Sequence, residues 1–317
     1  MTKEKPILDT PLRIYTAVWG TKHLELFEKT ILRSFLWNEN NAALLRENVT
    51  WSLHTNKKDS ARLIQLCKRT GIENYELTEI THPTEGIIEL QGGHPDIGAI
   101  LLNNFKSEIS RCLDTNARLL LAPPDSLFGD GTLNSLFSIG SQDGVCVAVP
   151  HPRTLPSIFE YPSRLCESLK DTLTNAELVT ETFRNLHKTW SEAEVGFDKI
   201  NSYVGGVMWR KLSHGLYSVQ HRLPTNYLLH FIPSDLQFFE QQICFGAIDH
   251  LWPTKLIKEE RERVIGSSDA AFICEVTEAH QNIPPAYPYV NREPDRFWRS
   301  AHHNIFFRQV NCIFRGV

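Results

Sequence analysis

No run of about 18 consecutive apolar residues occurs in this sequence of 317 residues, so a membrane-spanning helix is not expected. The seven cysteines are scattered, and no two lie within four residues of each other, which argues against a zinc knuckle or a redox pair. We expect reduced thiols that pack as small hydrophobic side chains. Internal repeats and low-complexity segments are also missing. With 41% hydrophobic and 22% charged residues, the composition is that of a soluble globular protein with its own core.

Positive charge is not in excess either. The chain carries 33 basic and 37 acidic residues, a net charge of −4. Proteins that coat nucleic acids or bind anionic membranes are usually basic, so the overall charge does not favour such partners. The first twelve residues are charged, contain two prolines and lack the features of a secretory signal, so a cytoplasmic protein is expected.

Four signatures of common enzyme classes are missing as well. The sequence has no Walker phosphate-binding loop, no Gly-x-Gly-x-x-Gly after the first strand, no Gly-x-Ser-x-Gly and no His-Glu-x-x-His. Their absence removes the usual ATPase, NAD-dependent, hydrolase and zinc-protease interpretations. A nucleotide-binding sheet without a glycine-rich loop must hold an anionic diphosphate in another way, and a divalent cation held by carboxylates is the usual alternative.

What the first half does contain is an alternation of β-branched runs and helical stretches. Strands are expected at 12–19, 49–55, 75–80, 118–122 and 145–149, and helices at about 21–36, 59–69, 95–113 and from 132 onward. This alternation predicts an α/β protein with a mostly parallel, Rossmann-like sheet that helices cover on both faces. The loops after the strands should then meet at one edge of the sheet.

The second half has a different pattern, which predicts a mixed β and helical portion. We expect a largely helical stretch at 160–190, β-rich pieces at 203–210, 216–220 and 227–232, and less clear ones at 243–252, 264–268 and 272–276. The last segment, 292–317, reads as an amphipathic helix. No linker separates the halves, so we expect two portions, 1–155 and 156–317, that pack as one body.

Two carboxylates follow the strand expected at 118–122. Asp125 and Asp130 lie in a loop that prolines and glycines stiffen, at the edge where ligands bind in parallel sheets. Together they are candidates for a Mg²⁺ or Mn²⁺ site that water and substrate phosphate complete. The structural alternative is that Asp125 caps a turn and that Asp130 starts a tight turn before a helix capped by Thr132.

Four further places are candidates. Asp249 beside His250, among apolar residues, suits a general base or a metal ligand. Asp269 follows an expected strand, His230 lies in an apolar strand, and Arg153 follows a strand where it would neutralise a phosphate. The structural alternatives are turn or helix caps for the aspartates, a hydrogen-bonded core position for His230 and a surface position for Arg153.

Several of these pieces occur together in an order that is familiar. Residues 119–133 read LLLAPPDSLFGDGTL, and LHFIP at 229–233, AID at 247–249 and SSD at 267–269 follow. With the opening strand IYTAVWG at 14–20, they resemble bacterial and phage glycosyltransferase-like proteins of the glycosyltransferase A fold. The resemblance covers roughly residues 12–276. The Asp-x-Asp metal signature is not present in that form.

The resemblance implies transfer of a sugar from a nucleoside diphosphate sugar, with a UDP-sugar as the expected donor, to a hydroxyl group. The acceptor would be a glycan, a protein or a modified DNA base. Portion 1–155 would hold the donor, and portion 156–317 the acceptor. The residues that the resemblance places at the base, the ribose and the phosphates are Thr16, Ala17, Trp19, Thr55 and Asp125. Arg153, the phosphate-neutralising candidate named above, joins them as a donor-binding residue.

The resemblance also suggests metal and proton-transfer groups. Mn²⁺ or Mg²⁺ would be contacted by Asp125, Asp130, His230 and His250. An inverting reaction needs a base near the acceptor hydroxyl, and Asp249 is the first choice for it, with Asp269 second. A retaining enzyme can lack such a base, and the sequence leaves both options open.

Two other functions stay open at this point. One is a catalytically silent module of the same fold that binds a nucleotide sugar or a partner protein. The other is a sugar transferase acting on modified DNA bases, for which the basic strip Lys57, Lys58, Arg62, Lys68 and Arg69 would contact the DNA backbone. Such a strip on a helix is more often a solvated face, and the net negative charge counts against it.

Overall fold

The computed structural model describes residues 10–45, 48–80, 97–166, 168, 170, 173–194, 207–221, 225–241, 259–279 and 310–317. Seven strands form its large sheet, in the order β11-β6-β10-β4-β1-β2-β3. Their bounds are Leu12–Ala17 (β1), Val49–Thr55 (β2), Tyr75–Glu79 (β3), Arg118–Leu121 (β4), Cys146–Val149 (β6), Thr225–Leu229 (β10) and Glu262–Val264 (β11). Neighbouring strands are parallel except β10, which is antiparallel to both β4 and β6. The predicted mostly parallel α/β sheet is therefore confirmed.

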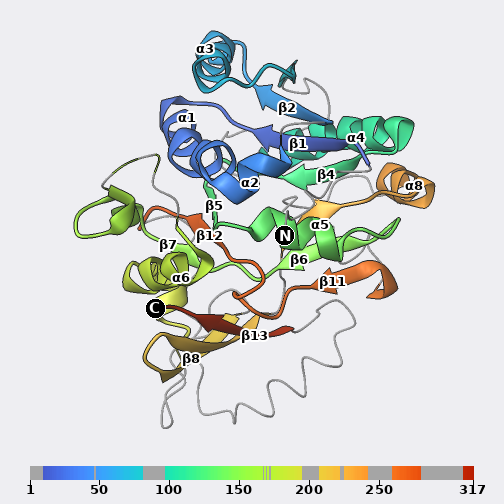
Figure 1. Ribbon diagram of the computed structural model, residues 1–317. Coiled ribbons are helices and arrows are strands. Elements are labelled where there is room, and N and C mark those ends of the chain that lie inside the picture. Colours follow the sequence, from blue (N-terminus) through green and yellow to red (C-terminus); the bar gives the residue numbers. More distant parts are fainter. Residues whose placement is uncertain are drawn as a thin grey trace, which may run out of the picture.

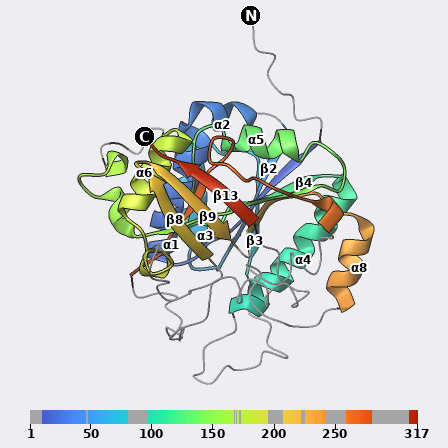
Figure 2. The same cartoon turned by 90° about the horizontal axis from the view of Figure 1, so that it is seen from below.

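Helices cover both faces of this sheet, as Figure 2 shows for α2 and α5 on one side and α4 and α8 on the other. The first face carries α1 (Thr21–Phe27), the π-helix η1 (Glu28–Trp37), α2 (Glu39–Leu44), α3 (Ser60–Thr70) and α5 (Thr132–Ile139). The second carries α4 (Ile97–Thr115) and α8 (Pro233–Gln241). No helix in these described parts is both long enough and apolar enough to cross a bilayer.

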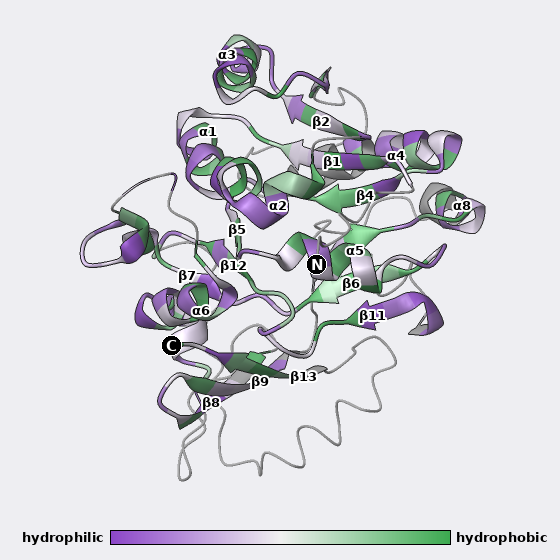
Figure 3. Cartoon of the chain, in the orientation of Figure 1, coloured by the Kyte–Doolittle hydropathy of each residue, from purple (hydrophilic) through white to green (hydrophobic). Residues whose placement is uncertain are grey.

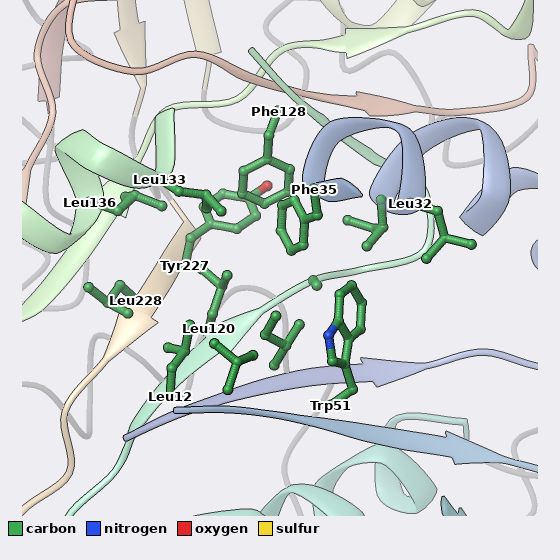
Figure 4. Packing of buried hydrophobic residues seen from close by; sticks show 14 of the residues in the cluster. Leu12, Leu32, Phe35, Trp51, Leu120, Phe128, Leu133, Leu136, Tyr227 and Leu228 are labelled. Atoms are coloured by element: carbon green, nitrogen blue, oxygen red, sulfur yellow. The ribbon is translucent and has the colours of Figure 1, made fainter. Parts of the chain in front are cut away.

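Alternating strand residues supply the two cores. On β1, Leu12 and Ile14 face the first set of helices, whereas Tyr15 faces α4. In the first core the rings of Trp51, Phe35, Phe128 and Tyr227 follow one another from β2 to β10, with centroids 4.9 to 6.0 Å apart (Figure 4). The hydropathy pattern agrees, because β4 is green after its first residue and the edge strand β11 is largely purple in Figure 3. These aromatic contacts hold the middle of the sheet together across the β10 insertion.

Two three-stranded sheets pack beside the large one (Figure 1). The first has the order β5-β12-β7, with β5 at Ser126–Phe128, β7 at Arg153–Thr154 and β12 at Ile273–Val276. The second has the order β13-β9-β8, with β8 at Val207–Ser213, β9 at Leu216–His221 and β13 at Val310–Arg315. The helical pieces here are η2 (Pro156–Phe159), η3 (Arg164–Cys166), α6 (Asn175–Arg184) and α7 (Lys188–Ser191), whereas η4 (Glu259–Arg261) directly precedes β11 of the large sheet. One shared cluster of buried side chains joins both small sheets to α6.

A buried charge network lies between the large sheet and α4. The carboxylate of Glu108 on α4 is completely buried and accepts hydrogen bonds from Arg13 Nε at 3.0 Å and from Arg111 Nη1 at 2.6 Å. Its other close neighbour is His54 Nε2, at 3.2 Å. Arg13 also bonds Glu76 on β3, at 2.6 Å. The Glu108 carboxylate thus ties two strands, β1 and β2, to α4, and Arg13 links β3 to them through Glu76.

Three expectations about the elements need correction. The helix expected at 292–317 is wrong where the structure describes it, because residues 310–315 form β13, with Cys312 and Phe314 buried in strand alternation. The stretch 160–190 is only partly helical, since α6 starts at Asn175 behind a capping box formed by Thr174 and Glu177. The single helix expected at 21–36 is α1 followed by the π-helix η1. The piece expected at 243–252 lies outside the described residues.

The expected boundary near residue 155 crosses the large sheet. Strands β10 and β11 belong to the portion 156–317, yet they complete a sheet whose other five strands belong to the portion 1–155. The two portions therefore share one sheet, and neither carries all of it.

Candidate functional site

The loops after the parallel strands β1, β2 and β4 meet at one edge of the large sheet. Thr16 Oγ1 donates a hydrogen bond to the carbonyl of Ala122 at 2.9 Å, which joins the end of β1 to the end of β4. Beyond β1, the backbone N–H of Gly20 donates to Asp59 Oδ2 at 2.6 Å. Gly20 has a φ of +81°, which a glycine adopts without strain. The loop at 18–20 is therefore fixed against the start of α3.

Replacing Asp59 by alanine should loosen this loop. The carboxylate is buried, and its short bond to Gly20 is charge-assisted, so its loss should lower the free energy of unfolding by about 2 kcal/mol. Urea unfolding measures this change. Asp114→Ala, on the exposed end of α4, is the matched control and should change stability by less than about 0.5 kcal/mol. Equal stability of the two variants would show that Asp59 does not hold the loop.

A cleft of about 290 Å³ opens beside the loop that joins β4 to β5. It is lined by Lys22, His23, Glu25, Leu26, Lys29, Asp125, Pro156, Phe159, Glu160, Val276 and Glu278. Four carboxylates and two lysines give this lining a net charge of −2 when the histidine is neutral. The cleft therefore combines cations able to bind a phosphate, carboxylates able to bind hydroxyl groups and a small apolar patch.

The walls of the cleft are tied to each other. Thr30 Oγ1 of η1 donates to the carbonyl of Pro124 at 2.7 Å, and the backbone N–H of Val276 donates to the carbonyl of Asp125 at 2.7 Å. Lys22 Nζ lies 2.8 Å from Glu278 Oε1. The backbone around Asp125 is held in this way by β12 on one side and by η1 on the other. These contacts fix the position of the Asp125 side chain in the lining of the cleft.

Next to the cleft, Glu275 of β12 anchors an ion cluster. It accepts hydrogen bonds from Arg153 Nε at 3.2 Å and from Thr277 Oγ1 at 2.8 Å, and His151 Nε2 lies 3.6 Å away. Burial alone would raise the pKa of Glu275, but the bond from His151 and the charge of Arg153 outweigh it and hold that pKa well below its usual range. A carboxylate of this kind is a weak general base, so its role is to position Arg153 and His151.

The structure brings only some of the predicted site residues to this edge. Asp125 lines the cleft, and Arg153 lies nearby but is paired with Glu275. Ala17 and Trp19 are half-buried in and after the end of β1. Thr16 and Thr55 are fully buried, so neither side chain is exposed to a ligand. The hydroxyl of Thr16 donates its hydrogen bond to the carbonyl of Ala122.

The expected pair Asp125 and Asp130 does not converge. Strand β5 separates the two residues, and Asp130 Oδ2 accepts a hydrogen bond from Asn40 Nδ2 of α2 at 2.6 Å, away from the cleft. Among the residues that the structure describes, no group of three or more His, Cys, Asp or Glu side chains is arranged to hold a metal ion. The two carboxylates thus do not fit a shared divalent cation.

His230 and Asp269 lie elsewhere. Strand β10 is antiparallel to β4, so the residue that follows β10 lies at the edge of the sheet where β4 begins. There, His230 Nδ1 accepts a hydrogen bond from the N–H of Gly144 at 3.2 Å. Asp269 precedes β12 at the end opposite Asp125, is 56% exposed and pairs with Arg315 at 3.3 Å. Asp249 and His250 lie outside the described residues.

Four functional candidates are not evident in the sequence. Lys22 and Glu278 line the cleft, and Glu275 anchors the ion cluster beside it. Asp59 holds the loop at 18–20. Asp59 alone has a signal, as the residue before an amphipathic helix, but that signal indicates a cap for α3 and not a bond to Gly20. Contacts between β12 and the β4 loop have no signature in the sequence, because about 150 positions separate their partners.

None of the known protein-family models matches the chain, and no curated protein matches it either. Among solved structures, that of S. aureus TarS aligns with a TM-score of 0.28 and 8% sequence identity. The alignment covers 50% of this chain and 27% of the TarS chain, so the chain spans about a quarter of the length of that protein. A similarity at this level carries no weight for function.

Proposed function

We propose that the protein is a glycosyltransferase that moves a sugar from a nucleoside diphosphate sugar, with UDP as the expected nucleotide, to a hydroxyl acceptor. The observation that carries this proposal is the position of Asp125. It leaves the central strand β4 at the carboxyl edge of the sheet and enters a cleft that also contains Lys22 and Lys29. Ligands of open α/β sheets bind at that edge.

Two cations of the cleft are available to the leaving group. Transfer breaks the bond between the anomeric carbon and the diphosphate oxygen and forms one to the acceptor oxygen, so negative charge develops on the diphosphate. Lys22 and Lys29 would neutralise that charge. Asp125 would accept hydrogen bonds from ribose or sugar hydroxyl groups. In an inverting reaction the acceptor proton passes to a carboxylate, for which Asp249 stays a prediction.

A metal has no step in this proposal. A divalent cation would bridge diphosphate oxygens and carboxylates, but Asp125 and Asp130 do not face a common point. The two lysines of the cleft therefore neutralise the diphosphate in the proposed reaction, and Mn²⁺ enters only as a variable of the test.

The proposal is tested by thermal unfolding with UDP, UDP-glucose and UDP-N-acetylglucosamine, each with and without Mn²⁺. A ligand present at 100 times its dissociation constant should stabilise the native state by about 2.7 kcal/mol. Lys22→Ala should weaken the effect of the best nucleotide. Lys188→Ala is the matched control, because Lys188 is an equally exposed lysine paired with a glutamate on α7. No stabilisation by any nucleotide would reject the transferase in favour of a silent module.

The DNA-modifying alternative receives no support from the strip on α3. Arg62 and Arg69 are paired with Glu25 and Glu28 at 3.4 and 2.5 Å. This pairing opposes contact of the strip with a phosphate backbone.

A further inference from the structure

Arg153 lies outside the cleft, on the other side of strand β12. In the parallel ladder of β7 and β12 it is the partner of Glu275, so the two side chains share one face of the small sheet. Ile273 on that face packs into the core of the large sheet. Cys274 and Val276 face the opposite core, and Val276 also lines the cleft. The guanidinium of Arg153 is therefore separate from the lysines of the cleft.

Arg153 emerges at the edge of the large sheet where ligands bind. Strand β6 runs parallel to β4, because β10 is antiparallel to both. Arg153 follows Val149, the last residue of β6, by four positions. The chain therefore leaves the sheet here at the same edge at which Asp125 follows β4. In open α/β sheets, ligands bind outside the carboxyl ends of the strands.

One side of the Arg153 guanidinium is fixed, and the other side is not used. Its Nε lies 3.2 Å from both carboxylate oxygens of Glu275. In the part of the chain that the structure describes, neither Nη1 nor Nη2 has a hydrogen-bond partner. The side chain is 20% exposed, and its terminal nitrogens are not among the buried polar atoms that lack a partner. The unused N–H groups thus reach the surface, in a planar fork that fits two oxygens of one phosphate.

The carboxylate beside Nε keeps this fork in place. Glu275 accepts a further hydrogen bond from Thr277 Oγ1 at 2.8 Å, and its side chain is only 16% exposed. The backbone of Arg153 is fixed as well, because its carbonyl accepts a hydrogen bond from the N–H of His187 at 3.0 Å. An anion at the two terminal nitrogens would contact the guanidinium and not the carboxylate, and little side-chain entropy would be lost on binding.

We propose that Arg153 anchors a second anion site, which binds a phosphate group through the two terminal nitrogens of its guanidinium. The site goes beyond the proposed transfer reaction, because it lies apart from the cleft and uses none of the residues that line it. A phosphate has the charge and the acceptor oxygens to bind both nitrogens at once. The group can belong to a nucleoside diphosphate or to a free phosphate, and the test separates these two sources.

Isothermal titration calorimetry with inorganic phosphate, pyrophosphate and UDP at constant ionic strength tests the site. At least one of these anions should bind, and Arg153→Gln should weaken it about tenfold, the effect of losing a charge-assisted contact. Arg153→Lys keeps the charge but not the fork, so it should weaken binding about fivefold. Arg184→Gln is the matched control, because Arg184 also pairs with a buried glutamate, Glu181 at 3.0 Å, but on the exposed side of α6. It should bind like the native protein.

The two substitutions of Arg153 are interpreted together. Arg153→Lys keeps a cation beside Glu275, so it tests the fork even where Arg153→Gln fails to fold. Binding that is absent for all three anions, or that Arg153→Lys leaves unchanged, overturns the site. UDP binding that weakens in Arg153→Lys supports a site for a nucleoside diphosphate, whereas weakening for phosphate or pyrophosphate alone supports a site for free phosphate. UDP binding that depends on Lys22 reports separately on the proposed function.

Discussion

Asp125→Asn is expected to reduce sugar transfer and hydrolysis of the donor by about 10- to 100-fold, the effect of weakening the charge-assisted hydrogen bonds that Asp125 accepts from ribose or sugar hydroxyl groups. The residue lines the cleft at the end of the central strand, and asparagine keeps its size but not its charge. The backbone bond from Val276 to residue 125 does not use the side chain, so the fold should persist. Steady-state release of UDP from the nucleotide sugar that binds best measures the effect.

The control for this variant is Asp114→Asn, which makes the same chemical change on the exposed end of α4, away from the cleft. It should leave the rate unchanged. A circular dichroism spectrum and melting temperature equal to those of the native protein are required of both variants. A rate for Asp125→Asn within threefold of the native rate would remove Asp125 from the site.

Glu108→Gln is expected to lower the free energy of unfolding by about 3 kcal/mol, because it leaves Arg13 and Arg111 facing a buried neutral group. The side chain is fully buried, and Arg13 would keep only Glu76, which is half-exposed. Urea unfolding at pH 7 measures the loss. Glu73→Gln on the surface should stay within about 0.5 kcal/mol of the native protein, and a similar small effect for Glu108→Gln would show that the network contributes little.

The same variant should flatten the acid limb of the stability curve. Burial alone would raise the pKa of Glu108, but the hydrogen bond from His54 and the charge of Arg13 outweigh it and lower that pKa from 4.5 to about 2. A depressed carboxyl pKa stabilises the fold above the unfolded value, and this stability is lost as pH falls. The native protein should therefore lose stability between about pH 4.5 and pH 2. Glu108→Gln should lose less over this window, and identical acid limbs would contradict the assignment.

The first half of the fold is predictable because its signals are local. The strand at 49–55 and the helices around 60–70 and 132–139 follow from periodicity and turn residues, as does the parallel arrangement. The antiparallel strand β10 is not predictable, because apolar strand residues such as Tyr227 and Leu228 specify burial and not direction. The sequence of β13 predicts a helix because a short apolar run among aromatic residues fits the helical period of 3.6 residues and the strand period of two equally well.

The candidate site is predictable only at its centre. Asp125 follows a recognisable strand, so its place at the sheet edge can be inferred from the sequence. Lys22 and Glu278 come together over more than 250 positions, and no spacing rule links such residues. The separation of Asp130 from Asp125 is not evident in the sequence, because the three residues 126–128 form a strand where a bent loop is expected.

The insertion of β10 between β4 and β6 has a consequence for biosynthesis. Leu228 pairs with Leu120, so the central seam of the sheet closes only when a segment more than 100 positions further along has been made. Until residue 229 has left the ribosome, β4 and β6 each present an unpaired edge to their surroundings. Unpaired edges of this kind are where growing chains associate wrongly, so these apolar strands are most exposed to wrong pairing before β10 has been made. The cleft beside β4 therefore rests on a sheet with paired central strands only after β10 has been made.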